Sequence, residues 1–262
     1  MADAPSEGRL QDELRSYYGP LLPHWDRTLR DRGDLAFWRR AAERRPGRAA
    51  LELGTGSGRV TEVLARAGRP VTGLDLNPDA VRRARDRLLG RTDVHLLVAD
   101  MRTFRLARRF GLVVAANDPL SHLRSDRGRD RALRRVAEHL AEDGRFLLDA
   151  LWFREEWVAE AAGPGGKVVR QRPGRGDEAA ATLEIRQRWR CDPDRRSCVA
   201  EFRVEDGDHT ITSTFRGRYW SPAELEERLR RAGLRTRRRW GDYEGTDWAP
   251  DSPHLVVEAV PR

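Results

Sequence analysis

Short apolar runs alternate with helical stretches between residues 48 and 151 of this 262-residue chain. The runs have the length of buried strands, and the stretches between them place apolar residues at helical spacing. The apolar runs are residues 48–53, 70–74, 94–99, 112–116 and 146–151, and the helical stretches are residues 59–67, 78–89 and 127–141. This alternation is typical of parallel βαβ units, so it predicts a doubly wound α/β sheet.

Further elements are expected on both sides of this core. They are helices at 8–18, at 23–45 and after Ser221, and strands at 182–190, 198–205, 209–219, 234–240 and 255–260. The strands between 182 and 219 alternate apolar and polar residues, which indicates an antiparallel sheet with one wet face. The glycine-rich segment 163–177 is expected to be mobile. We therefore expect a Rossmann-like, seven-stranded sheet with a small antiparallel β insertion after the fifth strand and an N-terminal helical lid.

This expectation divides the chain into four parts. They are a helical lid (1–46), a Rossmann-like core that binds a cofactor (47–162), the antiparallel insertion (163–220), and a helix with strands that complete the core sheet (221–262). We expect the insertion to lie on the substrate side. It could also supply oligomer contacts, which would allow a homodimer.

Charge and cysteine content narrow the classes of function. The formal charge of +8 is compatible with nucleic-acid binding, but acidic residues alternate with arginines along the helices, which indicates solvated faces with internal ion pairs. Cys191 and Cys198 match no zinc-site spacing, so we expect two reduced thiols near a hairpin and no metal. No apolar stretch suits a membrane helix or a signal peptide, so we expect a cytoplasmic protein.

The first predicted strand runs into a glycine-rich turn, Leu51-Glu52-Leu53-Gly54-Thr55-Gly56-Ser57-Gly58. Glycines let the chain turn tightly and bring bare backbone against a ligand. The helix that follows offers unpaired N–H groups to an anion. Dinucleotide-binding proteins use a similar turn, but the spacing here is G-x-G-x-G rather than G-x-G-x-x-G.

Acidic residues end the next two predicted strands. Asp75 ends the second strand, where a carboxylate can accept both hydroxyls of a ribose. A helix N-cap is its alternative role, but Asn77 before Pro78 already fills that position. Asp100 ends the third strand and can accept from an adenine amino group, while the backbone N–H of Met101 can donate to the ring. Ligands of open parallel sheets lie beyond the carboxyl ends of the strands, so an adenosine cofactor is expected there.

Taken in order, the segments ELGTGSG, LDLNPDAVRRAR and ADM resemble the cofactor-binding motifs of class I S-adenosylmethionine (AdoMet) dependent methyltransferases over residues 48–151. The later layout resembles bacterial small-molecule N-methyltransferases. DMRTFRLARRF is similar to the amino-sugar N,N-dimethyltransferases of macrolide pathways, and WGDYEGTDW is similar to the cypemycin N-terminal methyltransferase.

This resemblance implies a set of cofactor contacts. They are Glu52, Gly54, Thr55, Gly56 and Gly58 around the methionine part of AdoMet, Asp75 and Leu76 at the ribose, Asp100 and Met101 at the adenine, Asn117 at the sulfonium end, and Tyr17 or Tyr18 as a lid tyrosine. The two tyrosines could equally be core residues. S-adenosyl-L-homocysteine would be the product of the cofactor.

The segment after the fourth predicted strand, Asn117-Asp118-Pro119-Leu120-Ser121-His122-Leu123, is the candidate for chemistry. Related enzymes carry a loop that resembles FNSLxHL here, so His122 matches and Asp118-Pro119 departs. Methyl transfer from a sulfonium needs alignment and a desolvated nucleophile. A histidine with a near-neutral pKa could deprotonate an ammonium substrate, and Asp118 could hold a cationic amine. His122 could instead cap a helix or pack under the loop.

Aromatic residues late in the chain could line a substrate pocket. Trp152 follows the fifth strand and is placed to face the mouth of the site, and Tyr219 is a second candidate. An aromatic ring there could hold a planar or cationic substrate. Most of the other aromatic residues are expected to be ordinary core.

The sequence therefore favours an AdoMet-dependent N-methyltransferase that acts on an amine-bearing metabolite, an amino sugar or a peptide in secondary metabolism. An O- or C-methyltransferase of a small molecule is the alternative. A nucleic-acid methyltransferase is less favoured, because Asp118-Pro119-Leu120 lacks the second proline and the aromatic residue of the [DNS]-P-P-[YF] loop. An NAD-dependent oxidoreductase and a non-catalytic binding scaffold are the remaining classes.

Overall fold

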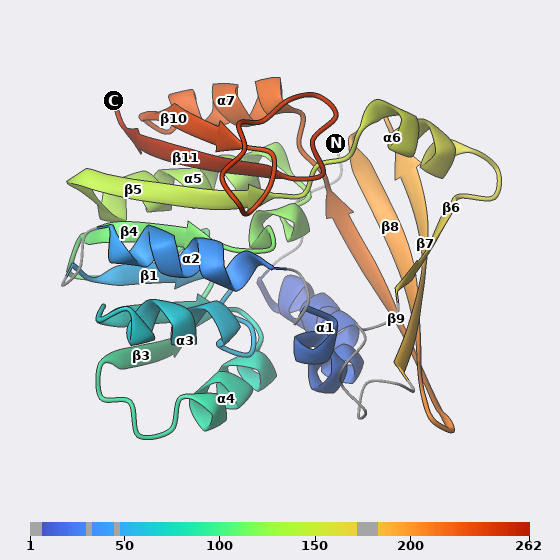
Figure 1. Cartoon of the computed structure of the whole chain (residues 1–262), viewed down its shortest axis with the longest axis horizontal. Coiled ribbons are helices and arrows are strands. Elements are labelled where there is room, and N and C mark those ends of the chain that lie inside the picture. Colours follow the sequence, from blue (N-terminus) through green and yellow to red (C-terminus); the bar gives the residue numbers. More distant parts are fainter. Residues whose placement is uncertain (1–6, 30–32, 45–47, 172–182) are drawn as a thin grey trace.

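The computed structural model describes residues 7–29, 33–44, 48–171 and 183–262. Its main sheet has seven strands in the order β10-β11-β5-β4-β1-β2-β3 (Figure 1). The strands are β1 (Ala50–Leu53), β2 (Val71–Asp75), β3 (Val94–Val98), β4 (Phe110–Ala115), β5 (Leu140–Ala150), β10 (Leu234–Trp240) and β11 (Leu255–Pro261). Strands β1 to β5 are parallel, and β11 is antiparallel to both neighbours. The doubly wound, seven-stranded sheet is confirmed.

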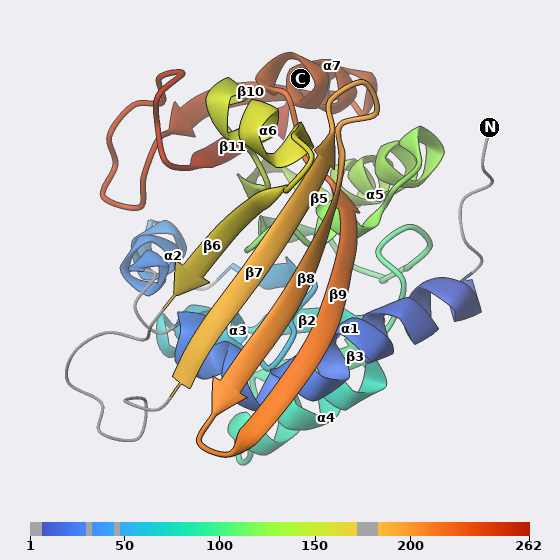
Figure 2. The same ribbon diagram turned by 90° about the vertical axis from the view of Figure 1, so that its right-hand side faces the viewer.

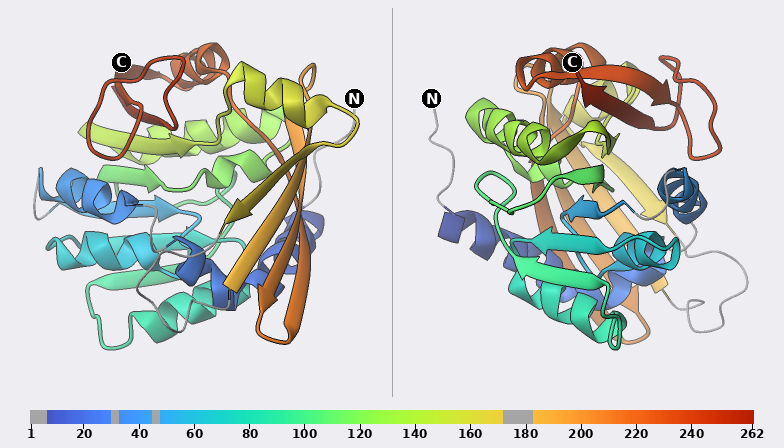
Figure 3. Two further views of the ribbon diagram at one scale, coloured as in Figure 1. Left: turned by 45° about the vertical axis from the view of Figure 1, so that its right-hand side comes forward. Right: turned by 90° about the vertical axis from the view of Figure 1, so that its left-hand side faces the viewer.

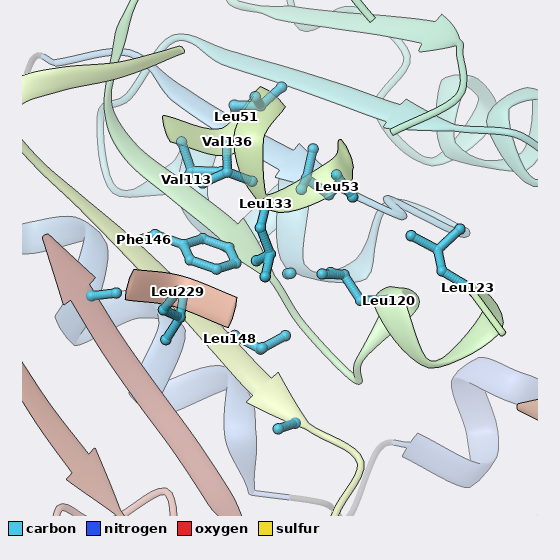
Figure 4. Close-up of a cluster of buried hydrophobic side chains, with 14 of the residues drawn as sticks. Leu51, Leu53, Val113, Leu120, Leu123, Leu133, Val136, Phe146, Leu148 and Leu229 are labelled. Atoms are coloured by element: carbon cyan, nitrogen blue, oxygen red, sulfur yellow. The ribbon is translucent and has the colours of Figure 1, made fainter. Parts of the chain in front are cut away.

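Helices cover both faces of this sheet. They are α2 (Asp34–Glu43), α3 (Arg59–Arg66), α4 (Pro78–Arg87), α5 (Asp126–His139) and α7 (Pro222–Arg231). The two faces of β1 contribute to different core clusters, since Leu51 packs with α5 and α7 whereas Ala50 packs with α2 and α3. Figure 4 shows the first of these clusters, in which Leu133 and Val136 of α5 lie over the sheet. Burial on both faces explains why the central strands read as continuous apolar runs.

Two helices begin where the sequence predicts. The side chain of Asn77 accepts a hydrogen bond from the N–H of Asp79 at 3.0 Å, with Pro78 in the first turn of α4. Ser221 accepts from the N–H of Glu224 at 3.2 Å at the start of α7. Both side chains satisfy a backbone donor that has no partner within its own helix.

A second sheet lies beside the carboxyl ends of the parallel strands (Figures 1 and 2). Its antiparallel order is β6-β7-β8-β9, and the strands are β6 (Lys167–Gln171), β7 (Leu183–Asp192), β8 (Ser197–Asp206) and β9 (His209–Arg218). Alternate residues of β7 are buried, as the sequence pattern predicts. Cys191 and Cys198 are cross-strand neighbours in the β7–β8 hairpin and are free thiols.

Part of the segment that we expected to be mobile is ordered. Strand β6 occupies residues 167–171 and pairs with β7 from Lys167↔Trp189 to Gln171↔Ile185. The pairing partner is distant in sequence, so the short Val168-Val169 signal was too weak to predict it. Residues 172–177 of that segment lie outside the described residues. Helix α6 (Glu155–Ala162) before it was also not predicted.

The N-terminal helices differ from the expected ones. Helix α1 (Glu7–Leu29) runs through Gly19 and Pro20, where we expected a break. Burial of Leu21 and Leu22 on the same helix outweighs the hydrogen bond that proline removes. The expected helix 23–45 is divided, since residues 23–29 belong to α1 and α2 begins after Gly33, whose φ is 75°. Figure 3 shows α1 between the parallel sheet and the second sheet.

Candidate active site

A pocket of about 940 Å³, part of it open to solvent, lies at the carboxyl ends of β1, β2 and β4. Helix α1 forms its outer wall through Leu10, Leu14, Tyr18 and Leu22. The residues expected at a cofactor or catalytic site that line it are Tyr18, Glu52, Gly54, Thr55, Gly56, Asp75, Leu76, Asp100, Met101, Asn117 and His122. Five others do not line it: Tyr17, Gly58, Asp118, Trp152 and Tyr219. The lining residues that sequence reasoning missed are Ser57, Arg59 and the apolar residues other than Leu76 and Met101.

The glycine turn brings bare backbone to the pocket. Gly54 has φ 68°, and a Cβ on it would lie 2.4 Å from the Cβ of Pro119. The 117–123 loop can therefore cross the turn closely only because residue 54 is glycine. Gly56 has φ 54° and faces open space. Gly58 has φ 82°, and its Cβ would lie 3.1 Å from Ala84, so this glycine serves the packing of α3 against α4.

Glu52 is a buried carboxyl at the end of β1. Thr55 donates to its Oε2 at 3.3 Å, and the Thr61 hydroxyl also donates to that oxygen. Burial raises the pKa of Glu52 to about 8, against the opposing effects of the Thr61 hydrogen bond and the nearby Arg59. Arg59 is itself held in a bidentate pair with buried Asp34, at 2.6 and 2.7 Å. The pocket thus contains a carboxyl that a cationic ligand would ionise.

Asp75 is fixed by two backbone donors. The N–H of Gly56 donates to one carboxylate oxygen at 2.9 Å, and the N–H of Asn77 donates to the other at 2.8 Å. Burial raises the pKa of Asp75, while these hydrogen bonds lower it. Each oxygen keeps a further lone pair, so the carboxylate can still accept from two ligand hydroxyls.

Asp100 is held by an arginine that sequence reasoning did not single out. The Arg102 guanidinium donates to both carboxylate oxygens, with its Nη2 at 2.6 Å from Oδ2, and the backbone N–H of Arg102 donates to Oδ1 at 2.7 Å. The Asp100 side chain is only 2% exposed. This chelate fixes the carboxylate at the wall of the pocket next to Met101.

His122 contacts the N-terminal helix at the far side of the pocket. Its Nε2 lies 2.9 Å from the hydroxyl of Tyr18, and its ring centroid lies 5.1 Å from Phe215 of β9. Burial among these rings lowers the pKa of His122 to about 4, with a smaller effect from Arg124. This value is below the near-neutral pKa that we expected for a base. Burial also raises the pKa of Tyr18.

Asp118 lies beneath the pocket and holds the loop to the rest of the fold. Its Oδ2 accepts from the N–H of Leu151 at 2.7 Å and from Nε1 of Trp220 at 2.8 Å. Burial raises its pKa to about 6, while the Arg129 charge lowers it. The side chain is 2% exposed in total, so the structure does not place it where an amine substrate would contact it. Its φ of 39° shows that the loop backbone is strained there.

The two expected substrate aromatics belong to packed clusters. Trp152 packs edge-on against Trp248, with ring centroids 5.8 Å apart. Tyr219 is 7% exposed and lies 5.6 Å from the ring of Phe153. Neither lines the pocket, so their substrate contacts stay predictions that this geometry does not favour.

A second, polar groove lies on the other side of α1. Its lining residues are Leu10, Glu13, Leu14, Ser16, Tyr17, His122, Thr212, Ser213, Thr214 and Arg216. Ser213 of β9 donates to the carbonyl of Tyr17 at 2.7 Å, which fixes α1 against the second sheet. His122 lines both this groove and the pocket. The two cavities therefore meet at His122.

Residues 50–144 match a family model described as a methyltransferase domain. This part of the chain is therefore similar to methyltransferase domains. Residues 50–144 contain β1 to β4, the glycine turn and every acidic residue of the pocket.

Curated proteins that are similar to part of this chain include two N,N-dimethyltransferases of amino sugars. A dTDP-3-amino-3,6-dideoxy-alpha-D-glucopyranose N,N-dimethyltransferase from Streptomyces fradiae is 34% identical over 108 residues, which are 41% of this chain and 41% of that protein. A dTDP-3-amino-3,4,6-trideoxy-alpha-D-glucopyranose N,N-dimethyltransferase from Streptomyces venezuelae is 32% identical over 45% of this chain and 51% of that protein. The matches thus span about half of these relatives or less.

Similarity in structure extends over nearly the whole chain. The CcbJ methyltransferase from Streptomyces caelestis superposes with a TM-score of 0.77 at 22% identity, covering 95% of this chain and 98% of that one. At this identity the likeness concerns the fold, and it includes the segments outside residues 50–144. The Rossmann-like methyltransferase fold with its second sheet is confirmed.

Proposed function

We propose that the chain is an AdoMet-dependent methyltransferase that transfers a methyl group to the nitrogen of an amine-bearing small molecule, an amino sugar or a peptide. One observation carries the proposal: Glu52, Asp75 and Asp100 line a single pocket together with the bare backbone of Gly56. The methyltransferase domain and the N,N-dimethyltransferases among its relatives support it.

The residues of the pocket fit AdoMet part by part. Gly56 faces open space, so its backbone can approach the methionine end, and Glu52 beside it can pair with the amino group. Asp75 has acceptor capacity left for the ribose hydroxyls. Asp100 and Met101 can bind the adenine at the next strand. Asn117 also lines the pocket and is the proposed contact at the sulfonium end.

The polar groove is the proposed site for the acceptor. It reaches the pocket at His122 and offers hydroxyls from Ser16 and Thr214, with a carboxylate at Glu13. These groups suit a hydroxylated, amine-bearing substrate, because hydroxyl and carboxylate oxygens accept from both hydroxyl and amino donors. The acceptor nitrogen would then approach from the side opposite to the carboxylate-lined wall.

AdoMet bound in the pocket supplies an electrophilic methyl group on a sulfonium. The chain must align a neutral amine with it and exclude water. His122 is uncharged above about pH 4 because of its lowered pKa, so it brings no positive charge next to the sulfonium. In either tautomer the Tyr18 oxygen keeps a lone pair that can accept from an amine N–H. We therefore assign the Tyr18–His122 pair to positioning the amine, whereas proton removal by His122 is disfavoured.

Calorimetry tests the cofactor half of this proposal. AdoMet and S-adenosylhomocysteine should bind with one-to-one stoichiometry, and NAD should not bind. Asp75→Ala should abolish or greatly weaken AdoMet binding. Asp79→Ala removes a half-buried carboxylate on α4 that does not line the pocket, and it should not weaken binding. Unchanged affinity in Asp75→Ala would refute the ribose assignment.

Transfer of a labelled methyl group tests the acceptor half. Amino sugars, small amines and short peptides are tested as acceptors, and those that are substrates should become labelled. Analogues in which a hydroxyl group replaces the amine should not become labelled. Labelling of the hydroxyl-only analogues would instead favour O-methylation.

Three further expectations are retained as part of the proposal. They are a cytoplasmic location, contacts of a homodimer through the second sheet, and the division of the chain at residues 46, 162 and 220. None of the described helices is long and apolar enough to cross a membrane. Cell fractionation and gel filtration check the first two expectations, and limited proteolysis checks the third.

A further inference from the structure

The pocket at the carboxyl ends of β1, β2 and β4 is the proposed AdoMet site and is called the AdoMet pocket below. A third cavity lies on the surface near it, and arginine side chains dominate its walls. We call it the arginine groove. Its lining residues are Arg102, Thr103, Arg105, Arg131, Arg134 and Arg135. The first three belong to the segment between β3 and β4, and the others belong to α5. No residue of the groove lines the AdoMet pocket.

Three charges in the arginine groove are not compensated. Arg102 is chelated to Asp100, and Arg135 pairs with Glu138 at 2.8 Å. Arg105, Arg131 and Arg134 have no carboxylate partner within the described part of the chain. Many exposed arginines elsewhere are paired along their own helix, as Arg230 is with Glu227 at 2.8 Å.

The two walls of the groove are held in a fixed relation by His139. The N–H of Leu106 donates to Nε2 of His139 at 3.0 Å, and Nδ1 of the same ring lies 2.8 Å from the carbonyl of Arg135. Phe104 packs over this ring, with centroids 4.5 Å apart. The loop wall is thereby attached to α5, so the arginines of the two walls line one groove before any ligand arrives.

We propose that the arginine groove is a binding site for a diphosphate group. Guanidinium groups bind phosphate oxygens in pairs of parallel hydrogen bonds, and they are less costly to desolvate than ammonium groups. A diphosphate presents several anionic oxygens over a short span, which suits a groove lined from two walls by three arginines without a carboxylate partner in the described part of the chain. The group could belong to a nucleoside diphosphate or to inorganic pyrophosphate. This inference is independent of the proposed methyl transfer.

Titration of inorganic pyrophosphate into the full chain at low ionic strength is the direct test. Arg131→Gln/Arg134→Gln should weaken binding by about tenfold or more, because each lost guanidinium removes charge-assisted hydrogen bonds. Glutamine keeps a good helix propensity, so α5 should stay folded, and circular dichroism confirms this. Arg127→Gln/Arg235→Gln removes the same charge from exposed positions outside the groove and should leave the affinity within about twofold.

Equal affinity in the two double variants, or no binding by the unaltered chain, would overturn the proposal. Thymidine diphosphate should compete for the same site. If thymidine diphosphate binds more tightly than pyrophosphate, the ligand of the groove is a nucleoside diphosphate. Equal affinity indicates that the ligand is pyrophosphate itself. If single-stranded RNA binds through the groove arginines and pyrophosphate does not, the groove recognises a nucleic-acid backbone. The proposal of a diphosphate site would then fail.

Discussion

The hydroxyl of Tyr18 lies 2.9 Å from Nε2 of His122, although 104 residues separate them in sequence. This contact joins the N-terminal helix to the loop after β4. It also marks the place where the carboxylate-lined pocket meets the polar groove. The position of this pair is therefore the structural basis for expecting methyl transfer there.

Loss of this contact should affect turnover more than cofactor binding. We expect Tyr18→Phe and His122→Ala each to lower the turnover number by about tenfold to a hundredfold, because the amine loses a positioning acceptor. The dissociation constant for AdoMet should change by less than about threefold. Tyr219→Phe is a matched control, since Tyr219 lines neither cavity. Single-turnover kinetics and calorimetry measure the two quantities, and full activity of both variants would contradict the assignment.

The dependence of rate on pH should not contain a histidine inflection near pH 6.5. Burial lowers the pKa of His122 to about 4, so the ring is neutral throughout pH 5–8. The acid limb of kcat/KM should instead follow the pKa of the acceptor amine, and it should move when an amine of different basicity is used. An acid limb that stays near pH 6.5 with every acceptor and disappears in His122→Ala would restore the role of a base.

AdoMet binding should release a proton from Glu52. The pKa of this carboxyl is raised to about 8 by burial, so it is mostly protonated at pH 7 in the ligand-free chain. The amino group of the bound methionine part would favour the carboxylate and lower the pKa. Calorimetry in two buffers of different ionisation enthalpy should show release of up to about one proton at pH 7 and less at pH 9. The Glu52→Gln variant should release no such proton when AdoMet binds.

The same shift has a consequence for the stability of the ligand-free chain. A carboxyl whose pKa is higher in the folded state contributes stability that is present below its unfolded value of 4.5 and is lost as pH rises through about 8. Glu52→Gln should therefore flatten the decline of unfolding free energy over this window. A slope that is identical in the variant would contradict the raised pKa.

Substitution of Asp118 should lower the free energy of unfolding. Asp118→Ala leaves the N–H of Leu151 and Nε1 of Trp220 without an acceptor. Each buried donor left unsatisfied costs about 1–3 kcal/mol, so we expect the two to lower the free energy of unfolding by about 2–6 kcal/mol. Asp118→Asn keeps an oxygen that can accept both bonds and should cost clearly less. Urea denaturation measures the difference, and equal losses in the two variants would show that the two hydrogen bonds are not the cause.

The order of strands and helices in the core could be predicted because its signals are local. Apolar runs, Asn77 and Ser221 as caps, and glycines at the first turn act over a few residues, and parallel strands then bring Glu52, Asp75 and Asp100 to one edge. The sequence pattern alone therefore located the candidate cofactor site. The likeness to known methyltransferases added the expectation that His122 lies near it.

The parts that sequence reasoning missed depend on contacts between distant residues. Helix α1 continues through Pro20 because Leu21 and Leu22 are buried, and β6 forms because β7 offers a partner. The sequence suggests that Asp118 could hold a cationic amine, but in the structure its carboxylate accepts from Trp220 and Leu151. Arg102 sits two residues after Asp100, yet nothing in the spacing reveals that it chelates that carboxylate.

Helix α1 contributes side chains to the AdoMet pocket and to the polar groove alike, with Leu10 and Leu14 in both. A movement of this helix that widens one cavity necessarily reshapes the other. The proposed sites of donor and acceptor therefore share one helical wall. We therefore expect a donor bound in the pocket to change the affinity of the polar groove for the acceptor.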